Sequence, residues 1–110
     1  KFGQPVDIVL GDCFGTSCAC EVTEIARKTL QSTGFSVIRN KPYSGGFTTR
    51  KYGHPINSVH VLQIEINRGL YMDEKRIRRS EGMNNLTQKI AEFIFALTKI
   101  DPKILHAKKD

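Results

Sequence analysis

The sequence predicts an α/β fold, and three features of its amino-terminal part lead to that prediction. A β-branched run at residues 6–10 ends in Gly11 and Asp12, which is typical of a buried strand that leads into a turn. An amphipathic stretch follows, and a second apolar run at residues 35–38 comes directly after Gly34. Strand, helix and strand within about 35 residues form a βαβ unit, which predicts parallel pairing and a right-handed crossover.

The helix of this unit is predicted from one apolar stripe with i, i+3, i+4, i+7, i+8 spacing. The residues of the stripe are Val22, Ile25, Ala26, Thr29 and Leu30. Ser17 is the predicted N-cap, because its side-chain oxygen can accept a hydrogen bond from a free helical N–H. Gly34 stands just past the predicted end, where a left-handed backbone favours glycine.

A long connection, residues 40–58, separates the second strand from a third strand at residues 59–67. The connection is rich in Pro, Gly, Tyr and Thr, and a loop of this length without secondary structure is usually functional or mobile. Side chains alternate along a strand, so the third strand has one apolar face for the core and one polar face. The apolar face carries Leu62, Ile64 and Ile66. The polar face carries Gln63, Glu65 and Asn67.

The last predicted element is a helix over residues 85–100, with Asn85 and Gln88 as a capping box at its start. Its apolar side comprises Leu86, Ile90, Phe93, Ile94 and Leu97. Pro102 closes this helix, and the polar tail, residues 103–110, is expected to fray.

The predicted sheet is small, with exposed edges and one uncovered face. The sequence also begins without an initiator Met or a signal-peptide pattern. We therefore expect residues 1–110 to be a single domain or, as the small sheet favours, a fragment of a larger α/β domain.

Charge and hydropathy narrow the class of partner. The 17 Lys and Arg against 11 Asp and Glu leave a formal charge of +6, concentrated only at residues 75–79, which we interpret as a solvated basic face. The sequence has no zinc-finger spacing and no aromatic RNA-binding signature, so it does not predict nucleic-acid binding. No apolar run approaches the roughly 18 residues of a membrane span, so no membrane partner is predicted.

Three cysteines, an odd number, argue against a disulfide framework. Cys13, Cys18 and Cys20 are too tightly spaced for a common zinc knuckle and no second pair follows, so we expect buried or half-buried free thiols in a reducing cytoplasm. The three histidines do not compose a three-ligand catalytic site. We therefore predict no metal ligand in this chain.

The polar row of the third strand is the strongest candidate for chemistry. In open α/β sheets, ligands bind beyond the carboxyl ends of the strands, and a carboxylate there, such as Glu65, can act as a general base. The alternative is that the row only meets solvent on an uncovered face, and the residues leave both interpretations open. Asp12 has the same predicted position at the end of the first strand, where an Asx turn is the simpler interpretation.

Four motifs in order along the chain resemble the carboxyl-terminal half of the N-formylglutamate amidohydrolases. They are Leu-Gly-Asp-Cys-Phe-Gly-Thr-Ser-Cys at residues 10–18, Asn-Lys-Pro-Tyr-Ser-Gly-Gly-Phe-Thr-Thr at 40–49, Tyr-Gly-His-Pro at 52–55, and the segment 59–74 around Gln-Ile-Glu-Ile-Asn-Arg. Residues 75–110 resemble only the closing helix of that family. Cys13 and Cys20 stand where the family pattern has Arg and Pro.

The resemblance implies a fold class and a reaction. The fold is part of a mixed-sheet α/β/α sandwich resembling zinc carboxypeptidases (phosphorylase/hydrolase-like), with this chain as the carboxyl-terminal fragment of the hydrolytic domain. The reaction is zinc-dependent hydrolysis of N-formyl-L-glutamate to formate and L-glutamate, a late step of histidine degradation in the bacterial cytoplasm. The basic charge of the chain fits such an acidic small-molecule substrate.

The resemblance also assigns residues. Glu65 matches the general base; Arg68 and Asn67 match residues that hold the substrate carboxylates; and Tyr43, Gly45 and Gly46 match a loop that lines the site. The family's zinc ligands, a His and Glu pair and a further His, lie in the amino-terminal half, so the zinc ligands are not expected in this chain and the isolated chain is expected to be inactive. The alternative is a non-catalytic α/β module that binds an acidic metabolite.

Overall fold

The structure, a computed structural model, describes residues 5–107 and is built on a three-stranded mixed sheet. The strands are β1 (Ile8–Gly11), β2 (Val37–Arg39) and β3 (Gln63–Ile66), in the order β2-β1-β3. β1 pairs with β2 in parallel, which confirms the predicted βαβ unit, and with β3 in antiparallel orientation. The fold class is therefore α/β with a mixed sheet.

The direction of β3 corrects one expectation. Because β3 runs antiparallel to β1, its carboxyl end lies at the amino end of β1, whereas Asp12 follows the carboxyl end of β1. The connection between β2 and β3 stays at the end of the sheet where β1 and β2 finish. Two backbone hydrogen bonds hold it there: Cys13 N–H donates to Ser44 O at 2.7 Å, and Val61 N–H donates to Ser17 O at 2.8 Å. β3 therefore starts at that end of the sheet and runs toward the amino end of β1, so the carboxyl end of β3 is at the opposite end of the sheet from Asp12.

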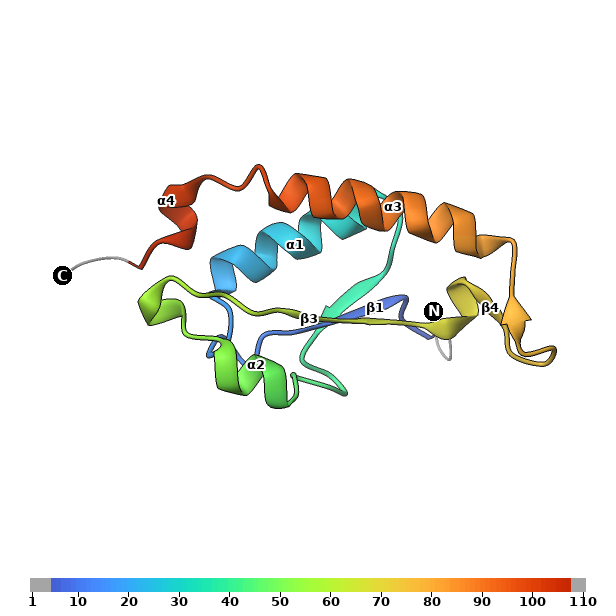
Figure 1. Cartoon of the computed structure of the whole chain (residues 1–110), viewed down its shortest axis with the longest axis horizontal. Coiled ribbons are helices and arrows are strands. Elements are labelled where there is room, and N and C mark those ends of the chain that lie inside the picture. The colour runs from blue at the N-terminus through green and yellow to red at the C-terminus, as the bar shows by residue number, and fades with distance from the viewer. Residues whose placement is uncertain (1–4, 108–110) are drawn as a thin grey trace.

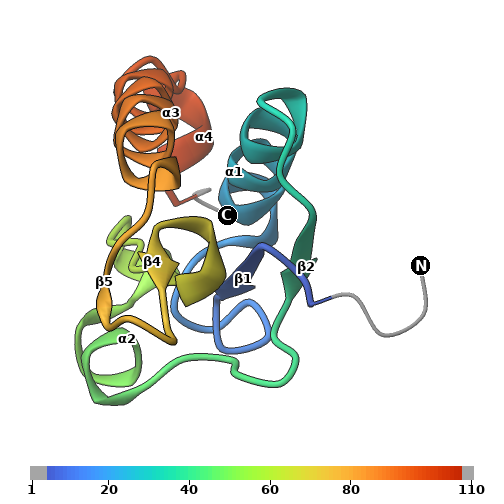
Figure 2. The ribbon, with the colours of Figure 1, turned by 90° about the vertical axis from the view of Figure 1, so that its right-hand side faces the viewer.

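Helices α1 (Cys20–Ser32) and α3 (Gly82–Leu97) cover one face of the sheet, and the short helix α2 (Phe47–Tyr52) lies on the other side (Figures 1 and 2). The core lies beneath the two long helices. Its fully buried side chains include Ile8, Leu10, Ala26, Leu30 and Phe93. As predicted, Leu62, Ile64 and Ile66 of the β3 segment pack against this core.

The start of α1 differs from the prediction, and its end agrees with it. Ala19, not Ser17, is the N-cap, because the Ser17 hydroxyl donates to Val61 O at 2.9 Å and fastens the β3 segment instead. Val22, Ala26 and Leu30 of the predicted stripe are buried, together with Thr23. Gly34 follows the helix at φ +101°, as expected.

The connection 40–58 is not free of secondary structure, which corrects a second expectation. It contains α2 and the 3₁₀ helix η1 (Pro55–Asn57). Thr49 closes the first turn of α2, since its Oγ1 accepts from Gly46 N–H at 2.8 Å, and this threonine is buried. α2 has no apolar periodicity because its one buried side chain is polar, so the pattern could not reveal it.

The carboxyl-terminal part holds several elements that the pattern did not predict. A 3₁₀ helix η2 (Arg68–Leu70) precedes a hairpin of β4 (Met72–Asp73) and β5 (Arg78–Arg79), and the exposed basic segment 75–79 forms its turn and second strand. The predicted solvated face at 75–79 is thus confirmed.

The last long helix also differs in detail. α3 begins at Gly82 and ends at Leu97, so Asn85 lies inside the helix and the predicted capping box is wrong. Ile94 was expected on the core side, but it is 56% exposed, while Leu86 and Phe93 are buried. No helix in the described part of the chain is long and apolar enough to span a membrane.

The tail is helical up to residue 105, which corrects the prediction of a frayed end. Pro102 does not end α3 but opens α4 (Pro102–Leu105), where its fixed φ suits the first helical position. Asp101 caps α4 by accepting from Lys103 N–H at 2.9 Å. The last part of the predicted tail, residues 108–110, lies outside the described residues.

Candidate functional site

The face of the sheet that α1 and α3 do not cover carries Glu65. The register sets Glu65 beside Val9 and Val9 beside Ile38, and all three alternate with the buried Ile8 and Leu10. Glu65 is exposed and lines a shallow hollow of about 130 Å³. The hollow is lined by Val6, Asp7, Val9, Glu65, Ile66 and Asn67. The structure thus brings two of the sequence-predicted residues, Glu65 and Asn67, to one surface.

Asn67 has a structural role besides its place in the hollow. Its Oδ1 accepts from Gly69 N–H at 2.9 Å and caps η2, and its N–H donates to Asp7 O at 2.9 Å. The side-chain oxygen is therefore engaged. Its Nδ2 makes no hydrogen bond to any of the residues 5–107, so this amide can donate to a ligand.

Arg68 lies outside the hollow, on the surface beyond the end of β3. Its side chain is 67% exposed and its Nε is 3.4 Å from a Glu74 carboxylate oxygen, whose side chain is 57% exposed. An ion pair this exposed holds its partners weakly, by at most about 1 kcal/mol. Arg68 is therefore free to exchange Glu74 for another carboxylate.

The loop with Tyr43, Gly45 and Gly46 lies at the other end of β3. Gly45 has φ +144°, and a Cβ there would stand 2.6 Å from Cys13 Sγ and 2.5 Å from Thr49 Oγ1, so only glycine fits. Gly46 is the N-cap of α2, and Tyr43 is 56% exposed. The two glycines are thus explained by backbone geometry, and Tyr43 is the loop's accessible side chain.

Gln63 links the loop to Glu65. A Cβ on Gly46 would lie 3.5 Å from Gln63 Oε1, and Gln63 stands two residues before Glu65 on the same face, about 7 Å away along the strand. Strand alternation placed Gln63 in the polar row, although it was not among the predicted substrate-binding residues. The loop and Glu65 therefore flank Gln63, whereas Arg68 lies beyond the opposite end of the strand.

A buried polar network anchors the start of this loop. Asp12 is 0% exposed, and its carboxylate accepts from Arg39 Nη2 at 2.8 Å, Asn40 Nδ2 at 2.8 Å and Gly15 N–H at 3.1 Å. The bond from Gly15 comes from three residues further along, so the Asp12 side chain closes this turn but does not form the predicted Asx turn, which would use the N–H two residues on. Asn40 returns a bond, since its Oδ1 accepts from Asp12 N–H at 3.0 Å.

The charge of Asp12 is stabilised within this network. Burial raises the pKa of the Asp12 carboxyl, but hydrogen bonds from Asn40, Thr23, Gly15 and Arg39 outweigh it and hold the pKa below its ordinary value. Asp12 is thus an ionised structural group. Spacing along the chain could not reveal the network, because its partners lie 27 and 28 positions away.

The described residues do not fit a zinc site. Among residues 5–107, no group of three or more His, Cys, Asp or Glu side chains is placed to hold a metal ion. His60 has both ring nitrogens engaged by backbone groups of Ala19 and Leu105. The cysteines are free, with Cys18 buried and Cys13 half-buried, while Cys20 is exposed, contrary to the expectation for it.

Comparison with known proteins finds relatives of this chain among the amidohydrolases. The family model described as N-formylglutamate amidohydrolase matches residues 2–72. The N-formylglutamate deformylase of Pseudomonas putida is 34% identical over 73 residues, which cover 66% of this chain and 27% of that protein. The Pseudomonas aeruginosa protein of the same name is 34% identical over 74 residues, covering 66% and 28%.

A solved structure extends the likeness beyond the motifs. The N-formylglutamate amidohydrolase from Ralstonia eutropha superposes with a TM-score of 0.82 at 33% identity, covering 90% of this chain and 36% of that one. The chain therefore spans well under half the length of these relatives.

Proposed function

This chain belongs to the N-formylglutamate amidohydrolase family, and from that membership we propose that it is the carboxyl-terminal part of an enzyme that hydrolyses N-formyl-L-glutamate to formate and L-glutamate. The observation that carries the proposal is the position of Glu65. It lies inside the matched segment and on the accessible face of the sheet, in the same hollow as Asn67, whose Nδ2 has no protein partner among the described residues.

Glu65 acts as the general base in this proposal. Its carboxylate removes a proton from the water that attacks the formyl carbon, and the proton then passes to the amide nitrogen as the C–N bond breaks. One water is consumed, and formate and the free amino group of glutamate are formed. Zinc, which the family implies, would polarise the formyl carbonyl, but the described residues supply no ligand set for it, so its ligands belong to the rest of the enzyme.

Substrate recognition is assigned to groups around Glu65. The Asn67 amide donates to one carboxylate of the substrate, and Arg68 leaves Glu74 to form a bidentate pair with the other. Tyr43 and the backbone at Gly45 and Gly46 line the opposite side. The dianionic substrate suits the formal charge of +6, and the three free thiols suit the cytoplasm, where histidine degradation takes place.

The free edge of β3 supports the assignment to a larger domain. Among residues 5–107, β3 pairs only with β1, and an open groove of about 400 Å³ runs beside it, lined by Ile64, Ile66, Tyr71, Met83 and Leu86. At the opposite edge, Val37 of β2 is 7% exposed and Phe35 is 8% exposed. The apolar surface left open beside β3 is where a further strand of the enzyme would pair.

The experiment is formate release from N-formyl-L-glutamate in the presence of zinc, by this chain and by a full-length family protein that contains it. The full-length protein is expected to turn over, and Glu65→Gln is expected to abolish turnover and leave the zinc content intact. Glu92→Gln, an exposed acid on α3, is the matched control and should keep full activity. Near-normal turnover by Glu65→Gln would remove Glu65 from the role of base, and saturable binding without turnover would favour a non-catalytic module.

A further inference from the structure

Gln63 lies on the uncovered face of the sheet, in register with Gly11 of β1. Glu65 and Val9 form the next pair on this face, because side chains alternate along a strand and cross-strand partners point to the same side. Two residues along a strand separate side chains by about 7 Å. Gln63 is therefore the neighbour of Glu65 on the side toward the loop at residues 43–46.

The loop packs directly on this face beside Gln63. A Cβ on Gly11 would stand 2.7 Å from the carbonyl carbon of Ser44 and 2.9 Å from the Gly45 nitrogen, so glycine at this position lets the loop backbone rest on the sheet. A Cβ on Gly46 would lie 3.5 Å from Gln63 Oε1. The loop backbone thus forms a wall at the end of the polar row, and Gln63 stands between this wall and the rest of the face.

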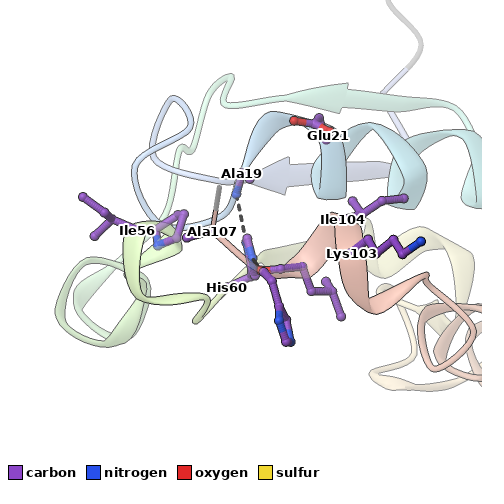
Figure 3. A pocket seen from close by; sticks show the side chains of 10 residues that line it. Ala19, Glu21, Ile56, His60, Lys103, Ile104 and Ala107 are labelled. Carbon is purple, nitrogen blue, oxygen red and sulfur yellow. Dashed lines mark hydrogen bonds between the residues drawn. The ribbon is translucent and has the colours of Figure 1, made fainter. Parts of the chain in front are cut away.

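Hydrogen bonds on both sides fix the backbone at Gln63. Before the strand, the imidazole Nδ1 of His60 accepts from Ala19 N–H at 3.1 Å, which is the dashed line in Figure 3, and Val61 N–H donates to Ser17 O at 2.8 Å. From Gln63 onward, the chain pairs with β1. The Gln63 side chain is therefore attached to a rigid element, which is what a precise binding group requires.

The side-chain amide of Gln63 is free to bind a ligand. The residue is half-buried, yet its side chain makes no hydrogen bond to any of the residues 5–107. Among these residues, Arg39 Nε is the buried side-chain atom left without a partner, so the unpaired amide of Gln63 is open to solvent. Its NH₂ group can donate and its oxygen can accept.

We propose that Gln63 holds the acyl amide of the substrate and, with the loop wall, limits the size of the acyl group. This inference rests on the proposed function, in which Asn67 and Arg68 take the substrate carboxylates beyond Glu65. The acyl end of the substrate then lies on the other side of Glu65, over Gln63. There the Gln63 oxygen accepts from the N–H of the scissile amide and orients the formyl carbon.

The wall gives a physical reason for a preference for the formyl group. An acetyl group carries a methyl where formyl carries only hydrogen. The loop that bounds this space is backbone at Gly45 and Gly46, which have no side chain that could move aside. Excluding one methyl group discriminates by about tenfold to 200-fold. Because Gln63 fills the space between the wall and Glu65, shortening Gln63 makes room for the methyl group.

The test compares hydrolysis of N-formyl-L-glutamate and N-acetyl-L-glutamate, with zinc, by a full-length family protein that contains this chain. Gln63→Met keeps the length of the side chain but removes its hydrogen bonds, whereas Gln63→Ala also opens the space. Both variants should lower kcat/KM for the formyl substrate by about threefold to tenfold. The formyl to acetyl ratio of kcat/KM should stay level in Gln63→Met and fall by about tenfold or more in Gln63→Ala.

A third substrate checks which end of the substrate Gln63 contacts. N-formyl-L-aspartate shortens the carboxylate side and leaves the acyl amide unchanged. Each Gln63 variant should therefore lower kcat/KM by the same factor on the aspartate and the glutamate substrate. A formyl to acetyl ratio that stays level in Gln63→Ala, with a changed ratio of glutamate to aspartate, would assign Gln63 to the carboxylate side and overturn the proposal.

Two controls separate contact with the substrate from structural damage. Gln88→Ala changes an exposed amide on α3 and should leave the kcat/KM of all three substrates unchanged. The urea midpoint of Gln63→Met should match that of the unmodified protein, because no hydrogen bond within residues 5–107 is lost. Full formyl turnover by both Gln63 variants would refute the role of Gln63 alone. Absence of turnover by the unmodified full-length protein would refute the proposed function and this inference together.

Discussion

Asp12→Asn tests whether the buried network at the end of β1 holds the domain together. The carboxylate receives one charged donor, Arg39, at 2.8 Å, and two uncharged donors on its other oxygen. The amide of asparagine must turn its NH₂ group toward one of these sets. The least damaging orientation turns the NH₂ group toward Arg39. This removes the hydrogen bond from the charged Arg39 and leaves the asparagine NH₂ and the Arg39 Nη2 donors facing each other.

The magnitude follows from these contacts. A hydrogen bond to a charged group contributes about 1.5 to 3 kcal/mol, and an unsatisfied buried donor costs about 1 to 3 kcal/mol. The Arg39 side chain is 29% exposed, so water restores part of its hydration and the lower end applies. We expect the free energy of unfolding to fall by about 3 kcal/mol.

The assay is urea unfolding of the chain at about pH 7, followed by far-ultraviolet circular dichroism. Asp7→Asn is the matched control, because Asp7 also accepts a backbone bond across the β1–β2 pair, from Ser36 N–H at 2.9 Å, but at an exposed position. Asp7→Asn should lower the free energy of unfolding by less than about 1.5 kcal/mol.

The pH dependence supplies an independent check with a definite sign. The hydrogen bonds hold the pKa of Asp12 below its unfolded value, which is about 3.9, so its contribution is fully present above that pH. The contribution is lost as the pH falls through the folded-state value. The difference in stability between the unmodified chain and Asp12→Asn should therefore shrink on going below about pH 4. A difference under about 1 kcal/mol at neutral pH, or one that stays constant on acidification, would refute the reasoning.

Two further substitutions test the loop and the core by thermal and urea unfolding. Gly45→Ala should destabilise the domain by about 1 to 3 kcal/mol because of its backbone conformation and the close Cys13 and Thr49 atoms. Gly46→Ala should cost less, about 0.5 to 1 kcal/mol, since its Cβ meets ordinary contacts and the substitution only exchanges glycine for a poorer N-cap of α2. Phe93→Ala should cost about 3 to 5 kcal/mol because Phe93 is fully buried, and Phe95→Ala, 62% exposed, should stay within about 0.5 kcal/mol. Equal effects within either pair would contradict the packing described here.

The sequence predicted those parts of the fold that depend on neighbours along the chain. The stripe through Val22, Ala26 and Leu30 and the turn glycine Gly34 are both set within a few residues, and both were confirmed. Ser17 shows where this reasoning stops. Its hydroxyl donates to the backbone oxygen of Val61, 44 positions away. A local sequence pattern contains no information about a partner at that distance, so it predicted a cap to the nearby helix N–H instead.

The orientation of β3 depended on tertiary structure in the same way. Periodicity found the strand and assigned its two faces, but its direction is decided by where residues 40–62 lead the chain. That path is fixed by long-range backbone bonds such as Cys13 to Ser44 and Val61 to Ser17. The same limit applies to the candidate site. The sequence identified Glu65 and its face of the strand, whereas the closeness of Gln63 to Gly46 could be seen only in the folded chain.

The hydrogen bonds divide the family motifs into two kinds of residue. In the first two motifs, Asp12, Asn40 and Thr49 direct their polar atoms to protein partners, and the loop glycines are required by close backbone contacts. These residues build the frame. On β3, by contrast, the side chains of Gln63 and Glu65 make no hydrogen bond within residues 5–107 and face outward from the sheet. A polar side chain that is fixed on a strand but has no protein partner keeps its hydrogen-bonding capacity for a ligand, and this is the physical reason to seek the chemistry at β3 rather than in the glycine-rich loop.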